Sequence, residues 1–164
     1  MFEIKISSIG NAKSYRDTWA TRSVGLVDPG EHIYTGNPYY HVEFFNDVSE
    51  DIPEFITPAK EHLLRVLEFS KSFNDSDKIL VHCHAGVSRS PAISSGILFQ
   101  HKMPAKNIFN HLENIRPNMY PNGLIIKLMD ELLDGKGELI NAFHEWEQKS
   151  KWSISKSGLI YKSS

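Results

Sequence analysis

The sequence predicts an α/β protein with a mostly parallel central sheet of about four to five strands and helices on both faces. Two observations predict this architecture. Short segments rich in β-branched and aromatic residues alternate along the chain with segments whose apolar residues recur every three or four positions. The strand-like segments also end at loops, as they do in folds in which each strand is followed by a helix. Ligands of such folds bind beyond the carboxyl ends of the strands, so we expect a site there.

Composition limits the kind of protein. The chain has 164 residues with 40% hydrophobic and 23% charged residues, which is typical of one globular domain with a substantial core. Its net charge of −2 argues against a nucleic-acid partner and against a polybasic membrane-binding surface. A single cysteine excludes an internal disulfide, and the N-terminal segment is typical of a strand rather than a signal peptide. We therefore expect a cytoplasmic protein with no membrane partner.

The first half of the chain carries the predicted strands. Residues 11–21 place apolar side chains on one helical face, and turn residues at Asp28–Gly30 and Gly36–Pro38 separate two of the strands. A polar break at Asn74–Asp77 precedes the most apolar strand. The four strand segments are Phe2–Ile6, Val24–Val27, Tyr40–Phe45 and Ile79–His82.

The second half is predicted to be helical. One helix begins with Thr57 as N-cap and Pro58 at its first position, and runs to Phe73. Glycine at position 135 is expected to end a later helix. The other predicted helices run from Pro91 to about His101, from Pro104 to the residues before Pro117, from Asn122 and Gly123 to about Asp134, and from about Glu138 to Lys149, with Trp152 on the apolar face of the last one. Residues 1–136 form the predicted main domain, and residues 137–164 form a helical extension and tail packed on it.

The segment from Ile79 to Pro91 combines a buried strand, the only cysteine, a short loop, an arginine and a helix start. A loop that folds back between a strand and a helix can direct its N–H groups at one point, and the helix dipole adds positive potential there. Cys83 in this field would be a thiolate, and Arg89 could bind a tetrahedral anion with two parallel hydrogen bonds. A thiolate nucleophile beneath a bound phosphate is the chemistry of a phosphatase.

Three other interpretations of this segment are possible. A lone cysteine after a buried strand is commonly only a small apolar side chain. His82, Cys83 and His84 are metal-binding residue types, but three adjacent residues do not easily converge on one ion. A rhodanese-like sulfur carrier also uses a cysteine loop, yet it does not require the pair Arg89 and Ser90. This pair favours the anion site.

The residues His82 to Ser90 match the signature H-C-x-x-x-x-x-R-[S/T] of the cysteine-dependent protein tyrosine phosphatase superfamily. The closer form H-C-x-A-G-x-S-R-S resembles the dual-specificity branch, and Arg116 with Pro121-Asn122 resembles its R-x(4)-P-N element. The resemblance covers roughly residues 24–133, in particular to a compact prokaryotic type of predicted tyrosine phosphatase. It implies a phosphatase-like three-layer fold, a phosphatase domain within residues 1–136, and no cofactor and no metal.

The resemblance also implies a role for each matched residue. Cys83 attacks phosphorus, and Asp47 first protonates the leaving oxygen and then activates water. Ser90 places a hydroxyl near the sulfur, and His82 lies behind Cys83 and supports the loop. The substrate phosphate is held by Arg89 and by the backbone amides of the loop residues His84, Ala85, Gly86, Val87, Ser88 and Arg89.

For three residues, two roles stay open at this point. Asp51 shares the acidic loop with Asp47, but Asp47 directly follows the aromatic strand and is preferred as the acid. Asn122 either hydrogen-bonds the cysteine loop or only caps a helix. Arg116 either meets substrate or pairs with a loop carboxylate.

The expected substrate is a phosphorylated protein or a small phosphate monoester, and a monomer is favoured. The K-N-R-Y loop of the larger tyrosine-specific enzymes is absent, which favours a shallower site that accepts phosphotyrosine and also phosphoserine or phosphothreonine. No lysine stands at His84, Val87 or Ser88, which argues against phosphoinositides. The alternatives are a phosphatase of a small-molecule phosphate and a phosphate-binding module with little turnover.

Overall fold

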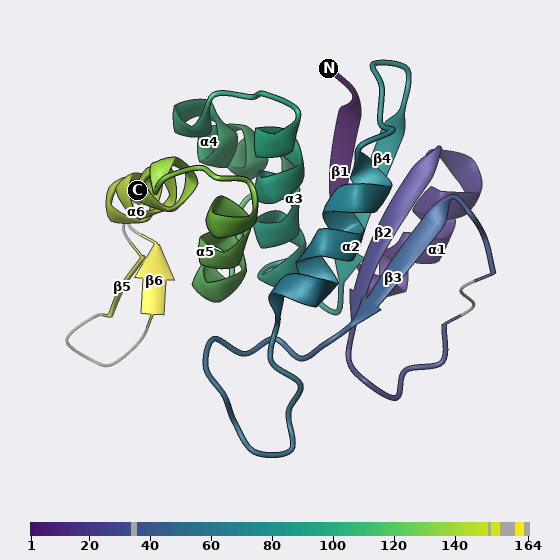
Figure 1. The fold of residues 1–164 in the computed structure, drawn as a ribbon, viewed down its shortest axis with the longest axis horizontal. Helices are drawn as coiled ribbons and strands as arrows, with labels where there is room; N and C mark the ends of the chain where they lie inside the picture. Colours follow the sequence, from purple (N-terminus) through teal and green to yellow (C-terminus); the bar gives the residue numbers. More distant parts are fainter. Residues whose placement is uncertain (34–35, 151, 155–159, 163–164) are drawn as a thin grey trace.

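A four-stranded parallel sheet forms the centre of the protein. The computed structural model describes residues 1–33, 36–150, 152–154 and 160–162. Within them, the sheet has the strand order β1-β4-β2-β3 (Figure 1). Its strands are β1 (Glu3–Ser8), β2 (Arg22–Val27), β3 (Tyr40–Phe44) and β4 (Lys78–Cys83), and every neighbouring pair is parallel. The predicted parallel sheet is confirmed.

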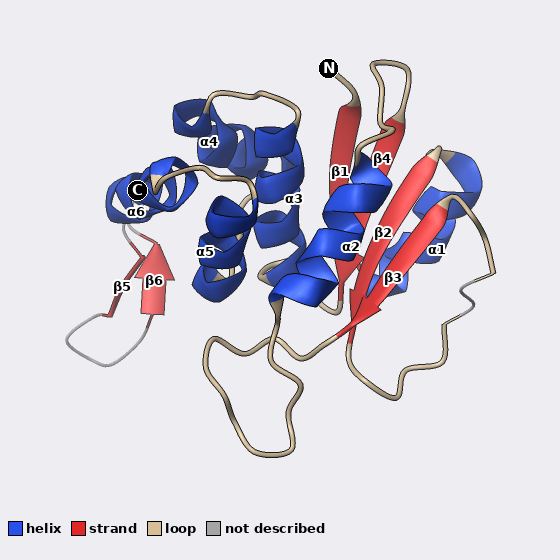
Figure 2. Ribbon diagram, viewed as in Figure 1, coloured by secondary structure: helices blue, strands red, loops and turns tan. Residues whose placement is uncertain are grey.

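Helices cover both faces of the sheet (Figure 2). On one face, α1 (Ile9–Thr18) packs against β1 and β4. On the other face, α2 (Lys60–Ser70) packs against β3 and α3 (Arg89–Gln100) packs against β4. Beyond α3 lie α4 (Ala105–Ile115), α5 (Gly123–Leu132) and α6 (Glu138–Ser150). The three-layer α/β arrangement is therefore confirmed.

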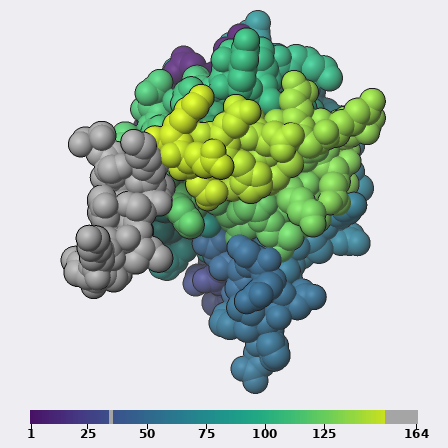
Figure 3. Space-filling view, turned by 90° about the vertical axis from the view of Figure 1, so that its left-hand side faces the viewer, coloured from purple at the N-terminus to yellow at the C-terminus, as the bar shows by residue number. Residues whose placement is uncertain are grey.

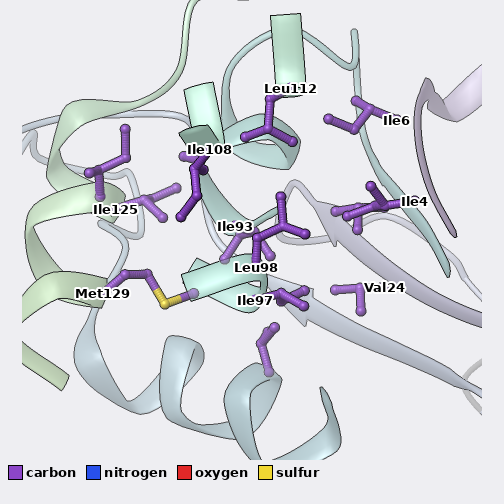
Figure 4. Close-up of a cluster of buried hydrophobic side chains, with 14 of the residues drawn as sticks. Ile4, Ile6, Val24, Ile93, Ile97, Leu98, Ile108, Leu112, Ile125 and Met129 are labelled. Atoms are coloured by element: carbon purple, nitrogen blue, oxygen red, sulfur yellow. The ribbon is translucent and has the colours of Figure 1, made fainter. Parts of the chain in front are cut away.

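The core surrounds α3, because this helix is buried along almost its whole length. Figure 4 shows Ile97 of α3 facing Val24 of the sheet on one side, with Met129 of α5 on the other. Gly96 makes the contact with α5 possible, since a Cβ at this position would lie 2.6 Å from Met129 Sδ. The small residues of α3 thus let it serve as the central helix that the cysteine loop leads into.

The start of α2 differs from the prediction. The helix begins at Lys60, with Ala59 as N-cap, rather than at Thr57 and Pro58. The His62 side chain replaces the expected threonine cap, because its Nδ1 accepts a hydrogen bond of 3.0 Å from the Ala59 N–H. Residues 57–59 instead belong to the connection that leads from β3.

The end of α5 also differs. The helix ends at Leu132, and left-handed backbone occurs at Asp134 (φ 50°) and Gly137 (φ 89°) rather than at Gly135. The turn is held by the buried Asp130 carboxylate, which accepts hydrogen bonds from the N–H groups of Gly137 and Leu139, both at 2.7 Å. Asp130 therefore joins the end of α5 to the start of α6.

Helix α6 packs on the same core. Phe143 and Trp146 are buried against Phe109 of α4, and Trp146 Nε1 donates a 3.0 Å hydrogen bond to Glu113. The inclusion of Trp152 in this helix was wrong, because it begins the short strand β5 (Trp152–Ile154), which pairs antiparallel with β6 (Ile160–Lys162). Residues 151, 155–159 and 163–164 of the predicted tail lie outside the described residues. The boundary at residue 136 stays a prediction.

None of the helices described is long and apolar enough to cross a membrane.

Candidate active site

The carboxyl ends of the strands meet at the lower edge of the sheet in Figure 1, where the predicted residues gather. Cys83 ends β4, Asp28 directly follows β2, and Asp47 follows β3 by three residues. All three border one pocket of about 610 Å³, together with Arg89 and part of the loop after β3. The topology thus brings a thiol, a guanidinium and two carboxylates to one cavity.

The loop Cys83–Arg89, hereafter the cradle, is supported from outside through its carbonyl groups. Its five successive carbonyl oxygens from His84 to Ser88 each accept a hydrogen bond from a neighbouring segment. The donors are Ile9 N to His84 O (3.0 Å), Arg116 Nη2 to Ala85 O (2.9 Å), Arg116 Nε to Gly86 O (3.0 Å), Tyr120 N to Val87 O (2.8 Å) and Asn122 N to Ser88 O (3.2 Å). Because the N–H of each trans peptide points opposite to its carbonyl, the amides from Ala85 to Arg89 face the inside of the cradle.

Gly86 is the one cradle residue that needs to be glycine. Its φ is +72°, in the left-handed region that L side chains rarely adopt. A Cβ there would also lie 2.6 Å from the Ser7 carbonyl, at the junction of β1 and α1. The cradle therefore folds tightly against the end of β1, which pairs with β4 up to Ser8 and Cys83.

The thiol of Cys83 lies at the bottom of the cradle and is 3% exposed. Its Sγ accepts a 3.2 Å hydrogen bond from the Gly86 N–H and lies 3.1 Å from Ser90 Oγ. Helix α3 begins at Arg89, so the positive end of its dipole adjoins the sulfur. Inward amides, a hydroxyl and a helix N-terminus form the environment that stabilises a thiolate.

The Arg89 side chain is buried and anchored at one end. Its Nη1 donates to Asp28 Oδ1 at 2.8 Å and to the Phe45 carbonyl at 2.7 Å. Its buried Nε has no hydrogen-bond partner among the described residues. A buried N–H without a partner is costly, and a bound oxyanion would satisfy it. The anchored Nη1 leaves the side of the guanidinium that includes Nε for such an anion.

Asp47 is exposed to the pocket but fixed in position. Its Oδ1 accepts hydrogen bonds from Ser88 Oγ at 2.8 Å and from Asn122 Nδ2 at 2.9 Å. One of these donors belongs to the cradle, so the acidic loop is joined to the cysteine loop through this carboxylate. Asp51, the alternative acid, is exposed and does not line the pocket.

Asn122 does more than either role left open from the sequence. Its Oδ1 accepts from the Ile125 N–H, which caps α5, while its Nδ2 donates to Asp47 and to the Val48 carbonyl at 3.1 Å. For Arg116 the structure shows a role that differs from both roles left open from the sequence, because its guanidinium donates hydrogen bonds to the outward carbonyls of Ala85 and Gly86. Both residues hold loops in place.

His82 lies fully buried behind Cys83. Its Nε2 shares a 2.6 Å hydrogen bond with the Tyr40 hydroxyl, and its Nδ1 has no partner among the described residues. Burial, with a smaller contribution from the Arg16 guanidinium, lowers the pKa of His82 to about 4, and burial raises the pKa of Tyr40. The imidazole is therefore neutral at neutral pH, and its hydrogen bond with Tyr40 joins β4 to β3.

The remaining predicted residues also lie at this site. His84, Ala85, Val87 and Ser88 line the pocket, whereas Ser90 is fully buried beside the sulfur. The described residues include no group of three or more His, Cys, Asp or Glu side chains placed to hold a metal. A second pocket of about 400 Å³, between α3 and the start of α6, contains none of the predicted residues.

Sequence reasoning missed the place of Asp28 at the site and the contact of Tyr40 with His82. Asp28 was interpreted only as a turn residue, although its place at the carboxyl end of a predicted strand was a signal that it lies at the site. Tyr40 was assigned to a strand, and nothing in the local pattern could indicate its contact with His82, because that contact joins β3 and β4 across β2.

Comparison with known proteins agrees with this geometry. A family model described as dual specificity phosphatase, catalytic domain, matches residues 28–132. Tyrosine-protein phosphatase MSG5 of Saccharomyces cerevisiae is 32% identical over 94 residues, which cover 56% of this chain and 18% of MSG5. This chain thus spans less than a fifth of the length of that curated relative.

Solved structures share the fold. The PTP-2 phosphatase of Cydia pomonella has a TM-score of 0.59 and 15% identity, with 99% of this chain and 94% of that chain covered. Human DUSP28 has a TM-score of 0.60 and 15% identity, with coverages of 81% and 92%. At this identity the likeness concerns the architecture.

Proposed function

This chain belongs to the dual specificity phosphatase family, and from this membership and the geometry of the site we propose that it hydrolyses phosphate monoesters through a phosphocysteine intermediate. The observation that carries the proposal is the position of Cys83. Its sulfur lies beneath inward-facing amides, beside Arg89, in a pocket that also contains Asp47.

In the first step the thiolate of Cys83 attacks phosphorus, and the S–P bond forms while the bond to the leaving oxygen breaks. The cradle amides and the Nε side of Arg89 stabilise the charge on the non-bridging oxygens. Asp47 gives its proton to the leaving oxygen. Because both fixed donors bind its Oδ1, Oδ2 is the oxygen that carries this proton.

In the second step a water molecule gives a proton to the Asp47 carboxylate and attacks phosphorus. The S–P bond breaks, inorganic phosphate leaves, and the thiolate returns. Ser90 Oγ, 3.1 Å from the sulfur, donates to the departing thiolate and makes it a better leaving group. His82 and Arg116 touch no reacting atom; they keep the cradle in shape.

The substrate class is a phosphorylated protein, with phosphotyrosine as the preferred residue and phosphoserine or phosphothreonine as further substrates. The family match supports this choice over a small-molecule phosphate. We place the protein in the cytoplasm because its single cysteine must stay reduced to react. A monomer is sufficient for this reaction, since every residue used in the mechanism comes from one chain.

Hydrolysis of p-nitrophenyl phosphate near pH 6 tests the proposal. We expect measurable turnover, a loss of at least about 10³-fold in Cys83→Ser, and little change in Ser95→Ala, a buried serine of α3 whose hydroxyl binds the Ala92 carbonyl. Acid quenching during turnover should also trap one phosphoryl group on the peptide that contains Cys83. Equal rates for the wild type and Cys83→Ser would refute the nucleophile, and phosphate binding without turnover would identify a binding module.

A further inference from the structure

The loop from Asn46 to Ile56, hereafter the rim loop, projects from the body of the protein beside the cradle. It extends below the sheet in Figure 1 and forms the blue projection at the bottom of Figure 3. The Asn46 N–H donates to the Ile56 carbonyl, and the Ile56 N–H donates to Asn46 Oδ1, both at 2.8 Å. Asn122 also holds the Val48 carbonyl. The base of the loop is therefore closed, as in a compact Ω-loop.

This loop places apolar side chains at the mouth of the pocket. Ile52 and Phe55 are 38% and 52% exposed, and both line the cavity that contains Cys83. A turn joins them, since the Phe55 N–H donates to the Ile52 carbonyl at 3.1 Å. Large apolar side chains held in water beside a polar cradle are unfavourable in the free protein, and such surfaces commonly mark a binding site. They lie where the group that carries the phosphate must sit.

The charges at the mouth restrict the ligand further. Two carboxylates, Asp28 and Asp47, and one guanidinium, Arg89, line the pocket together with His84. The rim loop adds three exposed carboxylates, Glu50, Asp51 and Glu54, and none of them forms an ion pair with the part of the chain that the structure describes. One phosphate fits the cradle, whereas a second would meet carboxylates. A cationic group outside the cradle would be attracted.

We propose that the rim loop selects the substrate, with Ile52 and Phe55 packing against an apolar side chain next to the phosphorylated residue and the loop carboxylates attracting basic residues on either side. The preferred substrate is then a phosphotyrosyl peptide with apolar and basic neighbours, and polyanionic phosphates are poor substrates. This inference rests on the proposed phosphatase activity and adds its specificity.

Two phosphotyrosyl peptides of equal length test the inference, one with leucine and arginines around the phosphotyrosine and one with alanine and glutamates. For the wild type we expect kcat/KM to be at least about tenfold higher on the first peptide, by charge and apolar contact together. The double variant Ile52→Ala/Phe55→Ala and the triple variant Glu50→Gln/Asp51→Asn/Glu54→Gln should each remove much of this preference. The effect of the triple variant should shrink as salt is raised.

A matched triple variant controls for net charge. Glu3→Gln/Asp134→Asn/Glu145→Gln removes the same number of carboxylates from exposed positions outside the pocket, and should keep the preference. Equal kcat/KM on the two peptides, or faster hydrolysis of an inositol polyphosphate, would overturn the inference. Fluorescence anisotropy of the same peptides on Cys83→Ser tests the preference through binding alone. Failure of the phosphatase proposal appears separately, as no turnover of p-nitrophenyl phosphate by the wild type.

Discussion

The cradle and the rim loop border the same pocket, but they are built in opposite ways. The cradle is braced along its length: Cys83, Gly86 and Arg89 are buried, and every carbonyl from His84 to Ser88 accepts a hydrogen bond from a neighbouring segment. The rim loop is closed only near its base, and Glu50 to Ile56 are exposed. Chemistry on phosphorus needs donors fixed to a fraction of an ångström, which only a braced segment provides. Recognition of the group beyond the phosphate needs a surface that projects.

Asp47 lies where the two regions meet. It belongs to the rim loop by sequence and to the cradle by its hydrogen bond from Ser88. The difference between Asp47 and Asp51, four residues farther along the same loop, is therefore a direct test of the comparison.

The largest effect is expected for Asp47→Ala. Loss of a general acid lowers kcat by about 10²–10⁴-fold and should flatten the basic limb of the pH profile. Asp51→Ala, a matched change at an exposed position outside the pocket, should alter kcat on p-nitrophenyl phosphate less than about threefold. The reverse order would assign the acid to Asp51 and separate Asp47 from the chemistry.

The next effect concerns how tightly the cradle is braced. Gly86→Ala combines left-handed backbone with a clash against the Ser7 carbonyl, so we expect the free energy of unfolding to fall by about 2–5 kcal/mol and the activity to fall with it. Gly30→Ala is the matched control, because Gly30 also has a positive φ (92°) but has no neighbouring atom within 4 Å of the added Cβ. It should lose only about 1–2 kcal/mol.

Urea unfolding and the rate on p-nitrophenyl phosphate would measure both glycine variants. Equal losses of stability in the two variants would mean that the close contact between Gly86 and Ser7 of β1 does not affect the free energy of unfolding.

The smallest effect is the pH dependence of stability. The pKa of His82 is near 6.5 in the unfolded chain and about 4 in the folded protein, so between these values the unfolded state binds more protons. The contribution of the neutral His82 imidazole to the free energy of unfolding is therefore present above pH 6.5 and is lost as the pH falls towards 4. The loss between pH 6.5 and pH 5 is about 2 kcal/mol. His62, whose pKa is also lowered, mainly by burial, contributes with the same sign.

The slope of unfolding free energy against pH measures this effect. His82→Gln should reduce the slope between pH 5 and 6.5, whatever its effect on absolute stability. The triple variant of Glu50, Asp51 and Glu54 should leave the slope unchanged, because these side chains are exposed to solvent in the folded protein as well as in the unfolded chain. An unchanged slope in His82→Gln would contradict a buried neutral imidazole behind the cradle.

The parts of the protein that its sequence alone determined are those in which the deciding interactions are local. The strand, loop and helix around Cys83 could be predicted because residues close in sequence must adopt one short turn to hold an anion. The four strands of the sheet were likewise evident from alternation and aliphatic runs. The position of Asp47 at this edge of the sheet could be predicted because its place shortly after a strand end is also a local feature.

Only the tertiary structure decided what depends on contacts between distant segments. Thr57 and Pro58 form a good local helix start, yet α2 begins at Lys60 because His62 caps it and the rim loop closes just before. The pairing of Arg89 with Asp28 joins residues 61 positions apart across neighbouring strands. Strand order is set by burial of whole elements against one another, and short sequence patterns carry no information about which distant elements will meet.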